Sequence, residues 1–388
     1  MWKKSLKIII LSSFAVIIAL ILSVQLWSST DQGKLPSKTA VILHAVNNNL
    51  IPLDIEAPAF LASTGSSNPE VVMLRENYET EVSDGHSIDL RVYRYSNVEE
   101  APIILYYHGG AFLEGYGSID THENVMRGLA ARTGAIVIGV GYRVAPEHIF
   151  PAAVEDSYDA LLWAYDHAEE LGGDPSQLAV IGDSAGGNLA AVVTMMAKDR
   201  EGPEIAAQIL YYPLTTFRDV EFASRTAYDS GYYLLSRQVM LKARDAYTPE
   251  EDMWYNPYTS PLEAKDIDGL PPAFIVTAEF DPLRDEGELY GKKLHENGIP
   301  VETVRYRGVM HGFVSFYEVM RSGEMAMNHS VRFLGEAFAG EVNEVPEEFE
   351  IAVEQPPQGI ARIKEEAEAY AIAAFLIGRT TWSQFHNW

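Results

Sequence analysis

The stretch Leu178-Ala179-Val180-Ile181-Gly182-Asp183-Ser184-Ala185-Gly186-Gly187-Asn188-Leu189 combines a short apolar run, a glycine-rich turn and the start of an apolar helical pattern. Its centre, Gly182-Asp183-Ser184-Ala185-Gly186, matches the pattern G-x-S-x-G. Small residues around Ser184 allow a strained backbone and a close approach of the next helix to the strand. The stretch therefore predicts a strand, a sharp turn that exposes a serine hydroxyl, and a helix from Gly187 onward.

Short apolar runs on both sides of this stretch alternate with helical patterns, which is the signature of a parallel sheet with crossover helices. Several runs are continuously apolar, as strands covered on both faces should be. The predicted strands are 89–95, 103–107, 135–140, 178–181, 206–211, 273–278 and 301–306. The predicted helices are 153–170, 188–199, 284–297 and 315–338. A segment rich in aromatic and charged residues, 215–253, interrupts the alternation and predicts a helical insertion.

A serine hydroxyl becomes a good nucleophile only when a base removes its proton and an acid orients that base. In a fold built around this turn, the acid and the base follow the serine at the carboxyl ends of later strands. His311 lies in a glycine-flanked loop just past the predicted strand 301–306, and it is the predicted base. Asp281 follows the strand 273–278 and is the predicted acid, with Asp285 on the next helix as the alternative.

The segment 108–112, His-Gly-Gly-Ala-Phe, follows the predicted strand 103–107. Glycines let a loop fold so that its backbone N–H groups point toward a developing negative charge. The predicted oxyanion hole comprises Gly109, Gly110, Ala111 and Ala185. Within it, Gly110, Ala111 and Ala185 supply the N–H donors and Gly109 forms the turn, while the preceding histidine is expected to brace the loop.

The composition excludes several classes of function. The 388 residues are 47% hydrophobic and 22% charged, which is typical of a folded protein. A net charge of −26 would repel a polyphosphate backbone, so nucleic acid is not an expected partner. The chain has no cysteine, which excludes a thiol nucleophile, disulfides and thiolate-bound metals. No metal or organic cofactor is expected, because the predicted serine chemistry needs none.

Both ends of the chain differ from the region between them. Lys3, Lys4 and Lys7 precede a mostly apolar stretch, 8–26, which at about 1.5 Å per residue just spans a bilayer core of about 30 Å. We therefore predict a signal anchor over residues 1–30, with the rest of the chain on the extracytoplasmic side. A cleaved signal followed by secretion is the alternative. Residues 341–388 predict an acidic linker and a terminal helix at about 359–377, with no assigned role.

Taken together, the motifs resemble those of the hormone-sensitive-lipase-like carboxylesterases, a family of α/β-hydrolases. The resemblance covers about residues 82–338, and its motifs are His108-Gly109-Gly110-Ala111, Tyr142-Arg143-Val144-Ala145-Pro146-Glu147-His148, Phe150-Pro151-Ala152, Gly182-Asp183-Ser184-Ala185-Gly186-Gly187-Asn188, Glu279-Phe280-Asp281-Pro282-Leu283-Arg284-Asp285 and His311-Gly312-Phe313. It implies an α/β-hydrolase fold over residues 76–340, with a mostly parallel sheet and helices on both faces. It also implies a helical cap made of residues 31–75 and the insertion at 215–253. Ala111 departs from the usual third glycine of the family, which keeps the N–H group but adds a methyl.

The residues and the resemblance point to the same chemistry, hydrolysis of carboxylic esters through an acyl-enzyme, with Ser184, His311 and Asp281 as a catalytic triad. An aromatic cap predicts a covered apolar pocket, so short-chain or aryl esters are the expected substrates. Because amide hydrolysis uses the same triad, an amidase or deacetylase is an alternative. A non-catalytic ligand-binding protein on the same fold is the second alternative. The expected partners are a small-molecule ester and, through the N-terminal helix, the membrane, and a homodimer is left open.

Overall fold

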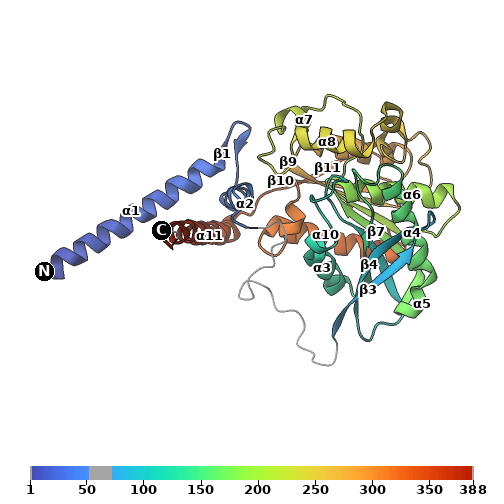
Figure 1. The fold of residues 1–388 in the computed structure, drawn as a ribbon, viewed down its shortest axis with the longest axis horizontal. Coiled ribbons are helices and arrows are strands. Elements are labelled where there is room, and N and C mark those ends of the chain that lie inside the picture. The colour runs from blue at the N-terminus through green and yellow to red at the C-terminus, as the bar shows by residue number, and fades with distance from the viewer. Residues whose placement is uncertain (1, 52–71, 387–388) are drawn as a thin grey trace. The chain divides into compact units, whose positions relative to one another are not determined.

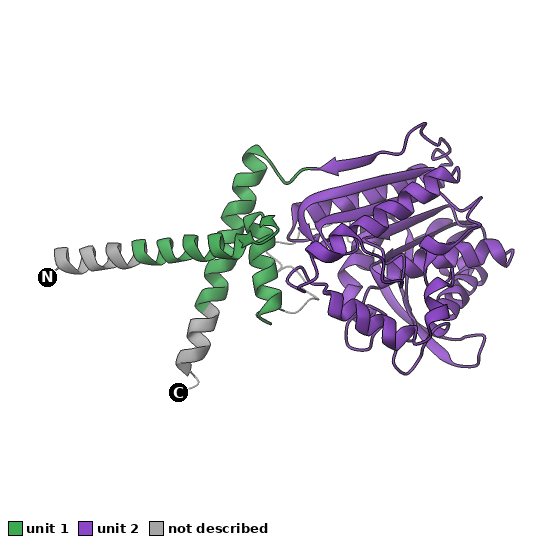
Figure 2. Ribbon diagram, turned by 90° about the horizontal axis from the view of Figure 1, so that it is seen from above, with its two compact units in different colours: residues 1–53, 355–388 green, residues 54–354 purple. Residues whose placement is uncertain are grey.

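The structure is a computed structural model that describes residues 2–51 and 72–386, with side chains described for residues 14–51 and 72–378. The chain divides into two units (Figure 2). One unit is Asp54–Glu354, and the other combines Met1–Leu53 with Gln355–Trp388. We call them the hydrolase-like unit and the helical unit.

A nine-stranded sheet runs through the hydrolase-like unit in the order β11-β10-β9-β8-β7-β5-β6-β4-β3 (Figure 1). The strands are β3 (Met73–Glu81), β4 (Ser87–Tyr95), β5 (Ala101–Tyr107), β6 (Ile136–Gly141), β7 (Gly173–Asp183), β8 (Ala207–Tyr211), β9 (Ala273–Phe280), β10 (Val301–Met310) and β11 (Ile351–Glu354). Neighbouring strands are parallel, except that β4 pairs antiparallel with both β3 and β6. The predicted, mostly parallel sheet is confirmed.

Helices cover both faces of this sheet (Figure 1). On one face, α3 (Glu123–Thr133) contacts α10 (Arg321–Phe338). On the other face, α4 (Ala152–Asp166) contacts α6 (Ala185–Asp199), and α9 (Arg284–Glu296) packs on β9 and β10. The short α5 (Ala168–Leu171) follows α4. Consecutive residues of β5, from Ile103 to Tyr107, are all buried, which is the pattern that two covered faces require.

The insertion between β8 and β9 is helical, as predicted. It contains α7 (Ala223–Ala227), α8 (Arg237–Tyr247) and the 3₁₀ turns η2 (Glu251–Tyr255) and η3 (Pro261–Glu263). Ser236 starts α8 because its hydroxyl accepts a hydrogen bond from the Val239 N–H at 3.0 Å. Two further 3₁₀ turns, η1 (Asp120–His122) and η4 (Phe313–Phe316), precede α3 and α10. The role of residues 215–253 as part of a cap stays a prediction.

Both edge strands of the sheet were absent from the sequence prediction. The strand β3 carries a polar, charged sequence with alternately exposed positions, so it has no apolar run. The prediction of a linker is wrong for residues 351–354, which form β11 and pair in parallel with β10. Two of the four β11 residues are exposed. An edge strand is held by backbone hydrogen bonds on one side, so its side chains need not be apolar.

The helical unit consists of α1 (Trp2–Ser28), α2 (Ser37–Asn47) and α11 (Gly359–His386), with a small hairpin of β1 (Ser29–Thr30) and β2 (Gly33–Lys34). Val24, Val41, Ala369 and Leu376 are buried together, so all three helices share one apolar core. The terminal helix begins at Gly359, as predicted, and extends to His386.

The segment 31–75, predicted as the first part of a cap, is divided in the structure. Residues 37–47 form α2 and pack with α1 and α11, because the apolar face of α2 is buried in their shared core. Residues 52–71 lie outside the described part of the chain. Residues 73–75 belong to β3.

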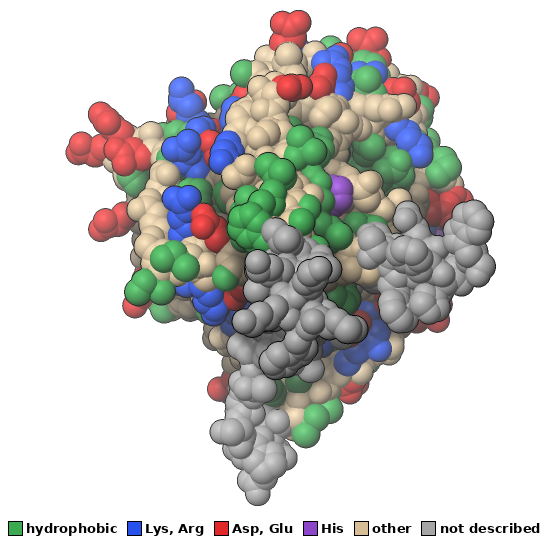
Figure 3. All heavy atoms as spheres, turned by 90° about the vertical axis from the view of Figure 1, so that its left-hand side faces the viewer, with side chains coloured by type: hydrophobic (Ala, Val, Ile, Leu, Met, Phe, Trp, Pro, Cys, Tyr) green, Lys and Arg blue, Asp and Glu red, His purple; other side chains and the backbone are tan. Residues whose placement is uncertain are grey.

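Large apolar side chains are exposed along α1, and hydrophobic side chains gather on the face of the molecule shown in Figure 3. The exposed positions of α1 are Phe14, Val16, Ile17, Ile18, Ile21, Leu22 and Leu26. Within the described residues, however, no helix has the length and mean hydropathy that a membrane span requires. Residues 8–13 of the predicted span lie outside the described side chains. The signal anchor and the membrane as a partner therefore stay predictions of the sequence.

Candidate active site

Ser184 lies at the sharp turn between β7, in the middle of the sheet, and α6. Its backbone has φ 56° and ψ −115°, a conformation that residues other than glycine rarely adopt. A methyl group at Gly186 would collide with the carbonyl oxygen of Tyr107, so only glycine lets α6 pass this close to β5. The G-x-S-x-G pattern thus forms the strained turn that the sequence predicts.

The predicted base and acid lie beside this serine. His311 directly follows β10, and its Nε2 is 3.0 Å from the Ser184 Oγ. Asp281 directly follows β9, and its Oδ2 is 2.8 Å from the Nδ1 of His311. The carboxylate of Asp281 is fully buried and also accepts the N–H of Leu283 at 2.8 Å. The structure therefore brings the three predicted residues into one chain of hydrogen bonds, which is the geometry for activating a serine hydroxyl.

Asp285, the alternative acid, has different partners. Its carboxylate accepts the N–H of Ser224 at 2.8 Å and pairs with Arg284. Partial burial opposes ionisation of Asp285, but the Ser224 N–H and the Arg284 charge outweigh it and lower the pKa of the carboxyl. In this arrangement Asp285 joins the insertion to α9, and the structure places Asp281 at the histidine.

The loop after β5 has a strained backbone beside Ser184. Gly110 has a φ of 138°, while Ala111 and Phe112 have φ of 55° and 58°. A side chain at Gly110 would contact the backbone of Gly117 at 2.9 Å. Ala111 therefore adopts a conformation that would cost less for the glycine usual in the family.

The backbone N–H groups near Ser184 fall into two sets. In the described part of the chain, those of Gly110, Ala111 and Ala185 donate to no protein acceptor. The N–H of Gly109 instead donates to the Oδ1 of Asp183 at 2.8 Å. Of the four residues predicted for the oxyanion hole, three therefore have an N–H group available to a ligand, and Gly109 holds the loop.

A sequence model of the α/β-hydrolase fold matches residues 104–315, more than half of the chain. The chain belongs to this family. The match includes the serine turn, the acid, the base and the loop after β5, and it leaves out the helical unit.

Relatives of this α/β-hydrolase include esterases. Carboxylesterase NlhH of Mycobacterium tuberculosis is 41% identical over 254 residues, which cover 64% of this chain and 78% of that protein. An arylesterase of Saccharolobus solfataricus is 38% identical over 231 residues, covering 60% and 74%. The solved structure of an esterase from Pyrobaculum calidifontis is 42% identical and superposes with a TM-score of 0.65, covering 69% of this chain and 86% of that one. The resemblance to hormone-sensitive-lipase-like carboxylesterases is confirmed.

A second histidine–aspartate pair is hydrogen-bonded to the loop after β5 of this hydrolase. Asp183, next to Ser184, accepts a hydrogen bond from the Tyr106 hydroxyl at 2.7 Å, and its Oδ2 lies 3.2 Å from the Nε2 of His122. Burial alone would lower the pKa of His122, but the Asp183 carboxylate outweighs it and raises that pKa. Burial likewise opposes ionisation of Asp183, yet His122 and the other donors lower its pKa. The pairing therefore favours the carboxylate form of Asp183, whose Oδ1 accepts the Gly109 N–H.

Sequence reasoning missed His122, because it precedes Ser184 and matches no motif. One signal in the sequence indicated that such a partner exists. Asp183 sits inside the G-x-S-x-G match, and a carboxylate buried at that position needs a partner. The sequence does not identify the partner, since it comes from a turn between β5 and α3.

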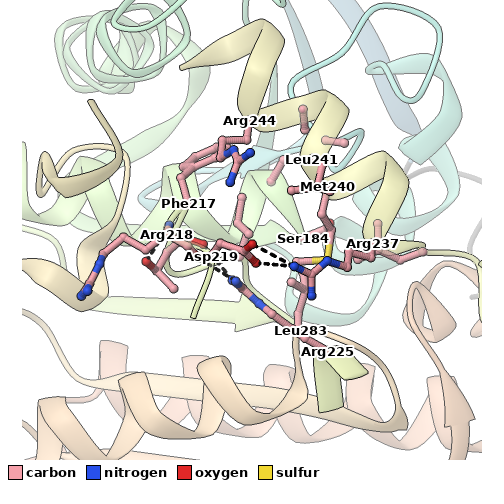
Figure 4. A pocket seen from close by; sticks show the side chains of 16 residues that line it. Ser184, Phe217, Arg218, Asp219, Arg225, Arg237, Met240, Leu241, Arg244 and Leu283 are labelled. Atoms are coloured by element: carbon pink, nitrogen blue, oxygen red, sulfur yellow. Dashed lines mark hydrogen bonds and ion pairs between the residues drawn. The ribbon is translucent and has the colours of Figure 1, made fainter. Parts of the chain in front are cut away.

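A pocket opens at Ser184, with Ala111 and Ala185 in its wall (Figure 4). The segment after β8, the insertion and the loop before α9 supply most of the apolar lining. These apolar residues are Leu214, Phe217, Leu235, Met240, Leu241 and Leu283. Among the described residues, no cluster of three or more histidine, aspartate or glutamate side chains could hold a metal ion.

Proposed function

We propose that this α/β-hydrolase is a serine carboxylesterase in which Ser184, His311 and Asp281 act as the catalytic triad. The observation that supports it is the unbroken chain of hydrogen bonds from Ser184 through His311 to Asp281, at 3.0 and 2.8 Å. Ser184 Oγ attacks the ester carbonyl carbon while His311 Nε2 takes its proton. His311 then returns the proton to the leaving alcohol oxygen, and the acyl group stays on the serine.

Deacylation repeats these steps with water as the nucleophile. His311 takes a proton from the water, the water oxygen attacks the acyl carbon, and the Ser184 oxygen leaves and recovers the proton. Asp281 holds the Nδ1–H of the imidazole throughout and stabilises the imidazolium that forms. The result is a free carboxylic acid and the unchanged enzyme.

The tetrahedral intermediate of each step carries a negative oxygen, which preorganised N–H donors stabilise. We assign this role to the N–H groups of Gly110, Ala111 and Ala185. Their support is that none of them has another acceptor in the described chain and that Ala111 and Ala185 line the same pocket as Ser184. Gly109 contributes indirectly, because its own N–H is held by Asp183.

The proposed substrates are short-chain or aryl esters. The pocket at Ser184 has a volume of about 40 Å³, which corresponds to a few water molecules at roughly 10–15 Å³ each. A short acyl group fits such a space better than a long one. The printed names of the relatives, a carboxylesterase and an arylesterase, agree with this substrate class.

Hydrolysis of 4-nitrophenyl butanoate tests the proposal. Wild type is expected to release 4-nitrophenolate, and Ser184→Ala is expected to lower kcat on the order of a million-fold, because the nucleophile is lost. Ser176→Ala, an exposed serine on the same strand, is the control and is expected to keep wild-type turnover. Wild-type turnover by Ser184→Ala would disprove the triad.

The matched anilide of butanoic acid, 4-nitrobutyranilide, separates the esterase from the amidase. We expect the ester to be hydrolysed with the higher kcat/KM, and a preference for the anilide would replace the proposal by an amidase. The signal anchor, the extracytoplasmic location, the cap role of residues 31–75 and the homodimer stay predictions of the sequence and are not part of this proposal.

A further inference from the structure

The pocket that contains Ser184 is lined by four arginines, all from the insertion (Figure 4). They are Arg218, Arg225, Arg237 and Arg244. An unpaired guanidinium beside a nucleophilic serine would affect which esters bind there, so the partners of each arginine matter.

Three of the four are matched by a carboxylate from another part of the chain. Arg225 pairs with the buried Glu286 of α9, its Nε 2.8 Å from Oε2. Arg218 reaches both oxygens of Glu263 at 3.1 Å. In the same way, Arg237 holds both oxygens of Asp219, at 2.9 and 2.8 Å. These carboxylates neutralise their arginines and leave little attraction for a ligand.

Arg244 is different. Its only carboxylate partner in the described chain is the adjacent Asp245, reached through Nε at 3.3 Å. That carboxylate is 68% exposed, so water screens its charge. No dashed line reaches Arg244 in Figure 4, and its Nη1 and Nη2 groups donate to no described protein atom. Arg244 therefore keeps donors for an acceptor that the described chain does not supply.

The Arg244 guanidinium is also held in position. It stacks on the ring of Trp254, with the carbon at its centre 4.2 Å from the ring centroid, and the indole is itself fixed by a hydrogen bond to the Thr248 carbonyl at 2.8 Å. Only 17% of the arginine side chain is exposed. A planar guanidinium that is stacked and shielded in this way binds a carboxylate more strongly than a mobile surface arginine.

The helix α8 presents this arginine together with an apolar surface. Arg237, Met240, Leu241 and Arg244 follow the spacing i, i+3, i+4, i+7, which places them on one helix face, and all four line the pocket. Arg244 lies two helical turns from Arg237, about 10.5 Å along the axis at about 1.5 Å per residue. The face therefore offers an apolar surface for carbon chains and, at its end, the Arg244 guanidinium, whose only described carboxylate partner is the exposed Asp245.

We propose that Arg244 makes this pocket selective for esters that carry a carboxylate in addition to the ester group. The inference rests on the proposed esterase function and specifies its substrate class. A single charge is favoured over a phosphate dianion, because among the described residues Arg244 is the one lining arginine that no carboxylate from outside its own helix pairs, and because the lining also holds Asp219. The carboxylate can belong to the acyl part or to the alcohol part of the ester, and both sources offer the same oxygen pair to Arg244.

Two pairs of substrates distinguish these sources. In the acyl arm, 4-nitrophenyl hydrogen adipate is compared with 4-nitrophenyl hexanoate. In the alcohol arm, 4-acetoxybenzoate is compared with 4-acetoxybenzamide. The readout in each arm is the ratio of kcat/KM for the anionic ester to that for its neutral partner, after subtraction of spontaneous hydrolysis. Wild type is expected to favour the anionic ester in one of the two arms.

Arg244→Met is expected to lower that ratio by about tenfold to a hundredfold, the usual range for losing a charged hydrogen-bonding partner. The ratio for Arg244→Lys should fall between those of wild type and Arg244→Met, since lysine keeps the charge and loses the planar donor pair. Lys242→Met is the matched control, because it removes one positive charge from the same helix at a side chain that lies over Tyr116 instead of in the pocket. It is expected to leave the ratio within twofold of wild type.

The inference is overturned if wild type favours the neutral ester in both arms, a result that does not depend on any variant. It is also overturned if Arg244→Met and Arg244→Lys keep the wild-type ratio, or if Lys242→Met lowers it equally. In those cases the neutral esters are still hydrolysed, and the proposed function stands. If wild type hydrolyses none of the four esters, the proposed function itself fails.

Discussion

Two buried histidine–aspartate pairs lie close to the turn at Ser184, and only one of the two histidines contacts the serine hydroxyl. The Nδ1 of His311 is 2.8 Å from Asp281, and the Nε2 of His122 is 3.2 Å from Asp183. The two pairs differ in what the second ring nitrogen of each histidine contacts. In His311 it faces the Ser184 hydroxyl, whereas in His122 it lies 2.9 Å from the hydroxyl of Thr121. A carboxylate partner therefore does not make a histidine a base; the contact with a nucleophile does.

The two aspartates also hold different groups in place. In the proposed mechanism, Asp281 orients the imidazole of His311, which moves protons. Asp183 holds the N–H of Gly109, and so sets the loop that supplies the N–H groups of Gly110 and Ala111. In the proposed mechanism the first pair acts in proton transfer and the second positions the oxyanion loop. Removing a member of each should therefore have effects of different size and kind.

The largest effect is expected from His311→Ala. Without the base, kcat for 4-nitrophenyl butanoate should fall on the order of a million-fold, as for loss of the nucleophile, because the two act as a unit. The control is His329→Ala on α10, where the imidazole lies 2.7 Å from the Tyr306 hydroxyl instead of the serine. Equal losses in the two variants would contradict the assignment of His311.

Asp281→Asn should lower kcat by roughly ten thousand-fold, since an amide favours the wrong imidazole tautomer. Asp285→Asn is the comparison, because it alters the neighbouring acid that bonds to Ser224. We expect that variant to stay within a few-fold of wild type. A larger loss of kcat in Asp285→Asn than in Asp281→Asn would mean that Asp285, and not Asp281, is the acid of the triad.

His122→Gln should lower kcat by about tenfold to a hundredfold and change KM little. Loosening the oxyanion loop weakens N–H donors that act mainly in the transition state, and losing one such donor outright costs roughly a hundredfold to a thousandfold. Steady-state kinetics with 4-nitrophenyl butanoate measures both constants. A loss as large as that of His311→Ala would mean that His122 takes part in proton transfer.

The smallest effect is expected in how the unfolding free energy of His122→Gln depends on pH. The folded state raises the pKa of His122, so the stabilisation from this pair is complete below the unfolded pKa of about 6.5 and is lost as pH rises through the folded pKa. The neighbouring His108 is neutral in this range, because burial lowers its pKa to about 4. Denaturant unfolding of wild type and His122→Gln should therefore show a larger difference in unfolding free energy at pH 6 than at pH 9. A difference that grows toward pH 9 would have the wrong sign.

Ser184, His311 and the loop after β5 were readable from the sequence because each lies at the end of an apolar strand with small residues beside it. Loop position favoured Asp281 over Asp285 in the sequence, and the structure agrees, because Asp281 lies at His311 and Asp285 at Ser224. His122 was not readable, because its partnership with Asp183 joins residues 61 positions apart without a repeated pattern.

The edges and ends of the chain were read less well for a physical reason. Strand prediction depends on apolar runs, and the edge strands β3 and β11 expose part of their side chains. The segment 31–75 has apolar character that indicates packing, but its sequence does not say against which partner α2 packs. The structure places α2 against α1 and α11.

Covalent labelling with the organophosphate paraoxon tests the central claim most directly, because it reports the activated serine itself. Peptide mass spectrometry of the treated full chain should find one diethylphosphoryl group on Ser184. Labelling should be absent in Ser184→Ala, far slower in His311→Ala, and retained in His122→Gln. A wild-type chain that stays unlabelled, or that carries the adduct at another residue while Ser184→Ala is labelled equally, would contradict the account.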